Sequence, residues 1–120
     1  MSTNLLNIKQ IIQSNPIAVA TIGADNKPNV IAVAFAKVVS KNELVITDNY
    51  MNQTRKDILK NGNICLAVWN SKWQGYKLAG KAKYFTSGKW KIFIETLKEN
   101  KGLPAKGAIL VKVNKVIKLS

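Results

Sequence analysis

The sequence predicts a mainly β (α+β) fold in which about six antiparallel strands close into a barrel flanked by short helices. Three observations predict this fold. The run 30–36 is apolar on both of its alternating faces, as in a strand that meets little water. Residues 76–85 alternate between apolar and basic side chains, and apolar residues recur at helical spacing between 90 and 97. Closure into a barrel hides a two-sided apolar strand and removes exposed edges.

The first elements are predicted to be a helix and a hairpin. Apolar residues recur at helical spacing between the capping candidates Ser2 and Thr3 and the helix-ending Pro16: Leu5, Ile8, Ile11 and Ile12. Residues 17–23 and 29–37 are β-rich and are separated by turn-forming residues at 24–28. We expect the second strand to continue through Val39 to a turn at 40–43.

The remaining elements alternate between strands and helices. We expect strands at 44–47, 64–69, 76–85 and 107–119, and helices at 53–61 and 89–100, with Gly62 and Gly102 beyond the helix ends. One face of strand 76–85 is expected to be exposed to solvent, because it carries Lys77, Lys81 and Lys83. In the last strand we expect one apolar side and one polar side, with the apolar side formed by Ile109, Val111, Val113, Ile117 and Leu119.

Composition predicts a single domain over residues 1–120, since 47% hydrophobic content is enough to bury a core. The net charge of +13 indicates an anionic ligand or partner, or a lysine-rich surface. Cys65 is the only cysteine and lies in an apolar run, which favours a buried thiol and a reducing compartment. We expect a soluble cytoplasmic protein with no membrane partner, because neither a leader-like segment nor a membrane-length apolar run is present.

The chain lacks the side chains of the usual catalytic and metal sites. It has no histidine, and its six acidic residues are scattered without a close pair. No serine lies in a nucleophile-elbow pattern. We therefore expect no catalytic side chain and no metal site. Any catalysis would depend on a cofactor that the protein positions and shields.

The most informative segment is 47–56, where a predicted strand passes into a predicted helix. Free N–H groups and the positive end of the helix dipole lie at such a junction. The chain adds the hydroxyl of Thr54, the amide of Gln53, the ammonium of Lys56 and the guanidinium of Arg55, its one arginine. These groups suit a phosphate-binding site. The alternative is that Asn52 and Thr54 are helix caps and that the basic residues belong to a solvated first turn.

Over nearly its whole length the chain resembles the pyridoxamine-phosphate-oxidase-like family of FMN-binding split barrels. In that family a strand ending in threonine leads to a basic residue four positions before a leucine, and then to an Asn-Pro pair and a strand. The segments Leu44-Val45-Ile46-Thr47 and Asn61-Gly62-Asn63-Ile64, with Arg55 and Leu59 between them, match this order. Ala79-Gly80-Lys81-Ala82 resembles the family's glycine-containing strand.

The resemblance implies a six-stranded antiparallel split barrel that binds FMN at the interface of a homodimer. It places the phosphate on Arg55 with Gln53, Thr54 and Lys56. The ring and ribityl chain would lie along Ile46, Thr47 and Asp48, beside the backbone of residues 33–35. Gln74 or Trp73 would reach the flavin across the interface.

Two departures from the family bear on function. Pyridoxamine-phosphate oxidases are longer and carry a C-terminal arginine and histidine set that this chain lacks, which argues against oxidation of pyridoxamine phosphate. A flavin-dependent oxidoreductase or electron carrier with an unknown small-molecule acceptor fits better.

Three other readings stay open. The same fold could hold a deazaflavin, or a haem, although the missing histidine disfavours haem. A basic barrel could also bind single-stranded nucleic acid, with Trp69, Trp73, Tyr76 and Tyr84 for stacking and the lysines of strand 76–85 for phosphates. The tyrosines and lysines fall on opposite faces of the predicted strand, which makes nucleic acid an unlikely partner.

Overall fold

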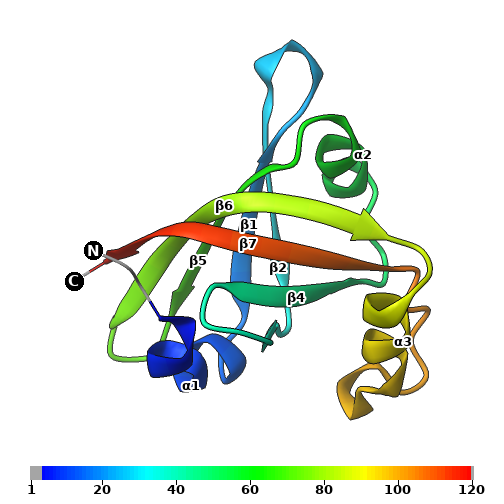
Figure 1. The fold of residues 1–120 in the computed structure, drawn as a ribbon. Coiled ribbons are helices and arrows are strands. Elements are labelled where there is room, and N and C mark those ends of the chain that lie inside the picture. Colours follow the sequence, from blue (N-terminus) through cyan, green and yellow to red (C-terminus); the bar gives the residue numbers. More distant parts are fainter. Residues whose placement is uncertain (1–3, 120) are drawn as a thin grey trace.

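The computed structural model describes residues 4–119 and confirms a mainly antiparallel β fold, a half-barrel with short helices outside it (Figure 1). Within these residues seven strands form one sheet in the order β2-β1-β5-β6-β7-β4-β3. The strands are β1 (Ile17–Ile22), β2 (Pro28–Val33), β3 (Lys37–Val38), β4 (Glu43–Asp48), β5 (Asn63–Trp69), β6 (Gly75–Phe85) and β7 (Gly107–Lys118). The helices are α1 (Lys9–Gln13), α2 (Gln53–Lys60) and α3 (Lys89–Thr96), with 3-10 turns η1 (Leu5–Ile8), η2 (Ala24–Asn26) and η3 (Lys98–Asn100).

The strand count differs from the expected six because the run 29–39 forms two strands. β2 pairs with β1, whereas β3 pairs with β4 at the opposite end of the sheet order. Residues 34–36 between them belong to neither strand. The apolar pattern could not reveal this break, since the apolar run 30–36 continues from β2 through the whole link.

The short link from β2 to β3 explains why the sheet curls. The four steps from Val33 to Lys37 span at most about 14 Å. The two outer strands of the sheet must therefore lie close together, which requires strong curvature. Figure 1 shows β1 and β2 crossing the direction of β4, β6 and β7, as such curvature demands.

The expected faces of the last strand are right up to Val113 and wrong beyond it. A bulge interrupts the pairing of β6 with β7, so that Ala79 pairs with Lys115 and Gly80 pairs with Val113. The extra residue reverses the faces of the strand. Val116 consequently packs against the core, while Ile117 and Leu119 are 36% and 45% exposed.

Two apolar clusters hold the elements together. The larger fills the half-barrel and includes Leu44, Leu66, Leu78 and Ile109, each no more than 1% exposed. The smaller lies under α3, where the predicted stripe packs around Ile94. Its partly buried members from this stripe are Trp90, Phe93 and Leu97. The 89–100 helix is shorter than expected, because Leu97 is extended and separates α3 from η3.

The helix ends follow their local chemistry. The capping candidates Ser2 and Thr3 lie outside the described residues, and the side chain of Asn4 accepts a hydrogen bond from the Leu6 N–H at the start of η1. α2 ends as predicted, with Gly62 at a φ of 73° just beyond it. Among the residues that the structure describes, no helix has the length and hydropathy needed to cross a membrane.

Candidate functional site

A cavity of about 850 Å³ opens between β2, the end of β4 and the start of α2. This volume is within the range of small-molecule and cofactor sites, roughly 300–1,000 Å³. One wall is apolar and follows β2 into the link, whereas the facing wall is polar and follows the segment from β4 to α2. The lining residues are Ile31, Ala32, Val33, Ala34, Phe35, Thr47, Asn49, Tyr50, Met51, Asn52, Gln53, Thr54, Glu99 and Leu103.

The polar wall includes the uncapped first turn of α2. Asn52 precedes the helix, but its side chain makes no capping hydrogen bond. The alternative that Asn52 caps the helix is therefore wrong, and Thr54 lies within the helix. The first N–H groups of a helix have no intrahelical acceptor and carry the positive end of the dipole. An anion at this end of the cavity would meet unpaired donors.

Two buried threonines on the wall have hydroxyl protons available to a ligand. The Thr54 Oγ1 accepts a hydrogen bond from Asn29 Nδ2 at 2.9 Å, and the Thr47 Oγ1 accepts one from Asn100 Nδ2 at 2.8 Å. Within residues 4–119 neither hydroxyl donates to a protein group. Thr54 is 1% exposed and Thr47 is 7% exposed. Each can therefore donate to a ligand acceptor in the cavity.

Arg55 lies behind this wall, in a cluster around a buried carboxylate. The Arg55 Nη1 donates to Asp48 Oδ2 at 3.2 Å, and the Tyr84 hydroxyl donates to the same oxygen at 2.6 Å. The other oxygen, Oδ1, accepts from the Met51 N–H at 2.8 Å. The hydrogen bond with Asp48 raises the pKa of Arg55. Burial, followed by the bond with Asp48, raises the pKa of Tyr84 to about 12.

The acidic side chain on the cavity wall is neutralised by a lysine. Glu99 accepts a hydrogen bond from the Lys37 ammonium, which lowers the pKa of Glu99. Lys37 also lies over the ring of Phe35, 5.9 Å from its centroid. The pair reduces the repulsion that Glu99 would exert on an anionic ligand.

The structure separates the predicted site residues into three groups. Thr47, Gln53 and Thr54 line the cavity, together with residues 33–35. Ile46 and Asp48 are buried behind the wall, while Arg55 is partly exposed beside Asp48 and Lys56 is exposed on α2. Gln74 is elsewhere: it lines a second cavity of about 610 Å³ between α1 and the turn from β5 to β6.

Sequence reasoning missed the residues that hold this wall in place. Asp57 accepts hydrogen bonds from Thr21 and Gln53, and Asn29 donates to Thr21 and Thr54. The spacing of Gln53 and Asp57, four residues apart on one helix, is a readable signal for their contact. Thr21 and Asn29 carry no such signal, because they reach α2 through the pairing of β1 with β2.

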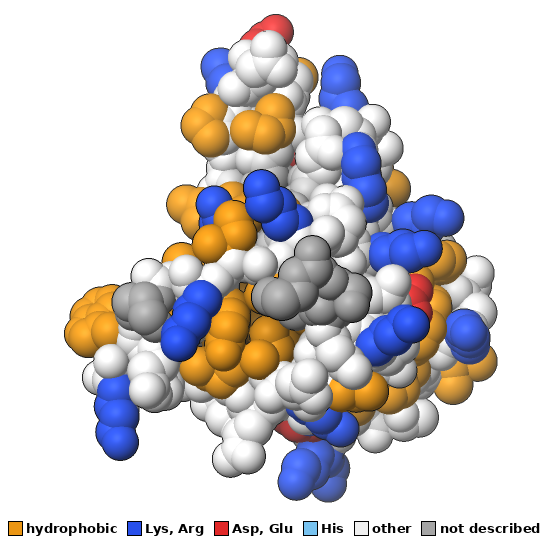
Figure 2. All heavy atoms as spheres, turned by 60° about the vertical axis from the view of Figure 1, so that its left-hand side comes forward, with side chains coloured by type: hydrophobic (Ala, Val, Ile, Leu, Met, Phe, Trp, Pro, Cys, Tyr) orange, Lys and Arg blue, Asp and Glu red, His pale blue; other side chains and the backbone are white. Residues whose placement is uncertain are grey.

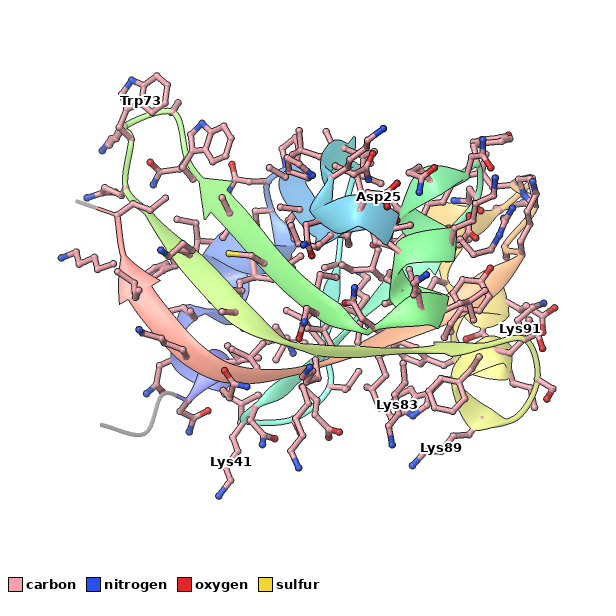
Figure 3. The ribbon with its side chains drawn as sticks, turned by 90° about the horizontal axis from the view of Figure 1, so that it is seen from above. Asp25, Lys41, Trp73, Lys83, Lys89 and Lys91 are labelled. Atoms are coloured by element: carbon pink, nitrogen blue, oxygen red, sulfur yellow. The ribbon has the colours of Figure 1, made fainter. Side chains whose placement is uncertain are left out.

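The groups expected to bind single-stranded nucleic acid do not form one surface. The rings of Trp69 and Trp73 stack on each other at 6.3 Å, whereas Tyr84 is bonded to Asp48 and Tyr76 packs against the core. Figure 3 shows Trp73 at the turn from β5 to β6, far across the molecule from Lys83. The arrangement does not provide the combined aromatic and basic groove that such binding uses.

The fold and the site together define a class of antiparallel half-barrels whose cavity is lined by an apolar wall and by hydroxyl and N–H donors. The sequence model of the pyridoxamine 5'-phosphate oxidase family matches residues 7–120. The chain belongs to this family.

Two curated proteins illustrate the relationship. An uncharacterized protein of Methanocaldococcus jannaschii, MJ0282, is 35% identical over 112 residues, which cover 90% of this chain and 75% of that protein. The pyridoxine/pyridoxamine 5'-phosphate oxidase of Bdellovibrio bacteriovorus is 32% identical over 89 residues, which cover 73% of this chain and 45% of that enzyme. The match thus leaves more than half of the enzyme without a counterpart.

Three solved structures share the fold. HupZ of Group A Streptococcus superposes with a TM-score of 0.86 at 24% identity, over 95% of this chain and 92% of that one. An FMN-binding protein of Syntrophomonas wolfei superposes with a TM-score of 0.74 at 13% identity, over 99% of this chain and 84% of that one. An F420 reductase superposes with a TM-score of 0.71 at 16% identity, over 89% of this chain and 92% of that one.

Proposed function

We propose that this protein binds FMN in the 850 Å³ cavity and acts as a flavin-dependent oxidoreductase or electron carrier. One observation carries the proposal: a cavity in a pyridoxamine 5'-phosphate oxidase fold has an apolar wall opposite an uncapped helix start and two buried hydroxyl donors. A flavin nucleotide combines a planar apolar ring with an anionic phosphate, so the two walls match its two ends.

The residues have distinct roles in this proposal. The first turn of α2, with Gln53 and Thr54, binds the phosphate, and the side chain of Lys56 adds positive charge beside it. Arg55 is held by Asp48 through one terminal nitrogen and contacts the phosphate with its other N–H groups. The strand backbone at residues 33–35 and the hydroxyl of Thr47 contact the ring and ribityl chain, with Ile46 and Asp48 supporting Thr47 from behind. When bound, the flavin supplies the electron-transfer chemistry that the side chains lack.

We further propose a homodimer that shares the flavin at its interface. Small apolar side chains cover the outer face of the sheet in two rows: Ala32, Ala18 and Ala67 are paired across three strands, and so are Val30, Ala20 and Cys65. Cys65 is half-buried on this face, not in the core as the sequence suggested. A second copy seated there would cover both rows.

The outer face also borders the cavity. Val30 is 67% exposed and Ile22 is 37% exposed, and Ala32 both belongs to the face and lines the cavity. Figure 2 shows hydrophobic side chains on the projecting β1–β2 hairpin, below its acidic tip. Because Gln74 lies outside the cavity of its own chain, it would contact the flavin only from the second copy.

The substrate is proposed to be a small-molecule electron acceptor and not pyridoxamine phosphate. The chain has one arginine and no histidine, and it spans 45% of the related Bdellovibrio enzyme. The unpaired single cysteine supports the cytoplasmic location expected from the sequence. A deazaflavin is the second candidate cofactor, favoured by the shared fold of the F420 reductase.

The visible spectrum of the freshly purified protein tests the cofactor. We expect flavin absorbance, or quenching of FMN fluorescence on titration of the apoprotein. A parallel titration with a deazaflavin nucleotide distinguishes the two candidates. A colourless protein that binds neither nucleotide would contradict the proposal.

A further inference from the structure

Four side chains form a hydrogen-bonded chain that joins the β1–β2 hairpin to α2. The Thr21 hydroxyl donates to Asp57 Oδ2 at 2.7 Å. The side-chain nitrogen of Asn29 lies 3.3 Å from Thr21 Oγ1 and 2.9 Å from Thr54 Oγ1. Figures 1 and 3 both show the hairpin beside α2, with Asp25 at the hairpin turn in Figure 3. The chain therefore runs from a buried acid to the wall of the cavity.

The direction of every hydrogen bond in this chain is fixed by its first member. Both oxygens of Asp57 accept hydrogen bonds, Oδ1 from Gln53 Nε2 and Oδ2 from the Thr21 hydroxyl, so the single hydroxyl proton of Thr21 points to Asp57. The Thr21 oxygen can then only accept, which requires the NH₂ group of Asn29 to face it. The same NH₂ group donates its other proton to Thr54 Oγ1, which leaves the Thr54 proton for another acceptor.

The position of Thr54 gives this proton one useful destination. Thr54 is 1% exposed and lines the cavity at the first turn of α2. Asp57 is 2% exposed, and its second oxygen accepts from Gln53 Nε2 at 2.8 Å. One buried acid thus orients both polar side chains at the end of the cavity where we place the phosphate.

We propose that Asn29 is a positioning residue that makes the Thr54 hydroxyl an obligatory donor to the ligand's phosphate, so that the site prefers phosphorylated to unphosphorylated flavin. The proposal rests on the proposed function. Asn29 acts through Thr54, so its contribution should depend on the Thr54 hydroxyl and on the presence of a phosphate.

A double-mutant cycle tests this dependence. FMN and riboflavin are titrated by fluorescence into wild-type protein, Asn29→Ala, Thr54→Val and the double variant. Asn29 is half-buried on an edge strand, so its replacement should leave the fold intact, which circular dichroism verifies. Asn42→Ala, a half-buried asparagine in the turn before β4, is the matched control. Thr54→Ser keeps the hydroxyl and should retain the dependence on Asn29.

We expect Asn29→Ala to weaken FMN binding by about five- to tenfold, since a hydrogen bond to a charged group becomes less well oriented. The affinity of Asn29→Ala for riboflavin should equal that of the wild type. In the Thr54→Val background, adding Asn29→Ala should cause no further loss of FMN affinity. Equal losses for FMN and riboflavin, or additive effects of the two substitutions, would overturn the inference and leave the proposed function standing. Wild-type protein that binds neither compound would overturn both.

Discussion

Buried carboxylates organise the site at the scale of single residues. Asp48 is 0% exposed and Asp57 is 2% exposed. Each carboxylate accepts hydrogen bonds on both of its oxygens. Asp48 accepts from Arg55, from Tyr84 and from the Met51 N–H. Asp57 accepts from Thr21 and Gln53. A buried charge requires such partners, because leaving it unpaired costs several kcal/mol, roughly 3–5 when one partner of a pair is removed. The partners are thereby held in fixed positions around the cavity.

Arg55→Ala should weaken FMN binding by about ten- to a hundredfold, because it removes the proposed charge-assisted contact of the guanidinium with the phosphate. Its bond to Asp48 uses one terminal nitrogen, and 30% of the side chain is exposed, so other N–H groups can reach a ligand. Fluorescence titration with FMN measures the effect. Lys60→Ala, a cation at the far end of α2, is the control. Unchanged FMN affinity in folded Arg55→Ala would restrict Arg55 to supporting Asp48.

Tyr84 should make stability depend on alkaline pH. Its pKa is raised from 10.0 to about 12, so the folded protein binds the phenol proton more tightly than the unfolded chain. This contribution is fully present below pH 10 and is lost as pH rises through 12. Denaturation of wild-type protein and Tyr84→Phe should show a stability difference that shrinks across this interval. A constant difference would mean that Tyr84 titrates normally.

At the scale of elements, the start of the segment from β4 to α2 is held by the residues that precede β7. The Lys106 N–H donates to the carbonyl of Asp48 at 2.8 Å, and the Ala105 N–H donates to Asn49 Oδ1 at 2.8 Å. Asn100, 4% exposed, connects Asn49 to Thr47. The segment before β7 thus fixes the polar wall, which reduces the entropy that ligand binding would otherwise cost.

Gly107→Ala should destabilise the protein where β6, β7 and β4 meet. A Cβ at Gly107 would lie 2.3 Å from both Cζ and Oη of Tyr84, so the ring must move and its bond to Asp48 would be lost. We expect a loss of about 1–3 kcal/mol from overpacking. Chemical denaturation measures it, with the exposed Thr86→Ala expected to stay within about 0.5 kcal/mol of wild type. Equal stabilities would show that the ring relocates freely.

At the scale of the whole molecule, charge and the outer sheet face act together. The net charge of +13 opposes association of two copies, yet the rows that include Ala20 and Ala67 present no charge of their own on β1, β2 and β5. Burial of this apolar face would supply the attraction. The same positive field would draw an anionic nucleotide toward the cavity.

Val30→Lys should convert the proposed dimer to a monomer, because it places a charge on the most exposed large side chain of the paired rows. Sedimentation analysis measures the change. Leu59→Lys is the matched control, since Leu59 is 65% exposed and Val30 is 67% exposed, but Leu59 lies on α2 away from this face. A Val30→Lys dimer as stable as wild type would place the interface elsewhere, and a monomeric wild-type protein would contradict the proposed homodimer.

Much of the fold could be predicted from the sequence because its signals are local. The alternation in 76–85, the stripe of α3 and Gly62 at the end of α2 depend on neighbours within a few residues. The break between β2 and β3 and the bulge in β7 could not be predicted. Both arise from pairing between distant strands. The apolar run continues across the first break, and only Lys115, at a position of the expected apolar side, marks the second.

The site divides in the same way. The sequence by itself determined that the strand containing Thr47 leads into a helix with Gln53 and Thr54 in its first turn, since backbone preferences and helix geometry are local. Only the tertiary structure decided that Arg55 pairs with Asp48, that Gln74 lies at another cavity, and that Asn29 reaches Thr54. Hydrogen-bond direction depends on which groups the curled sheet brings into contact, and that contact is fixed by strand pairing across the whole chain.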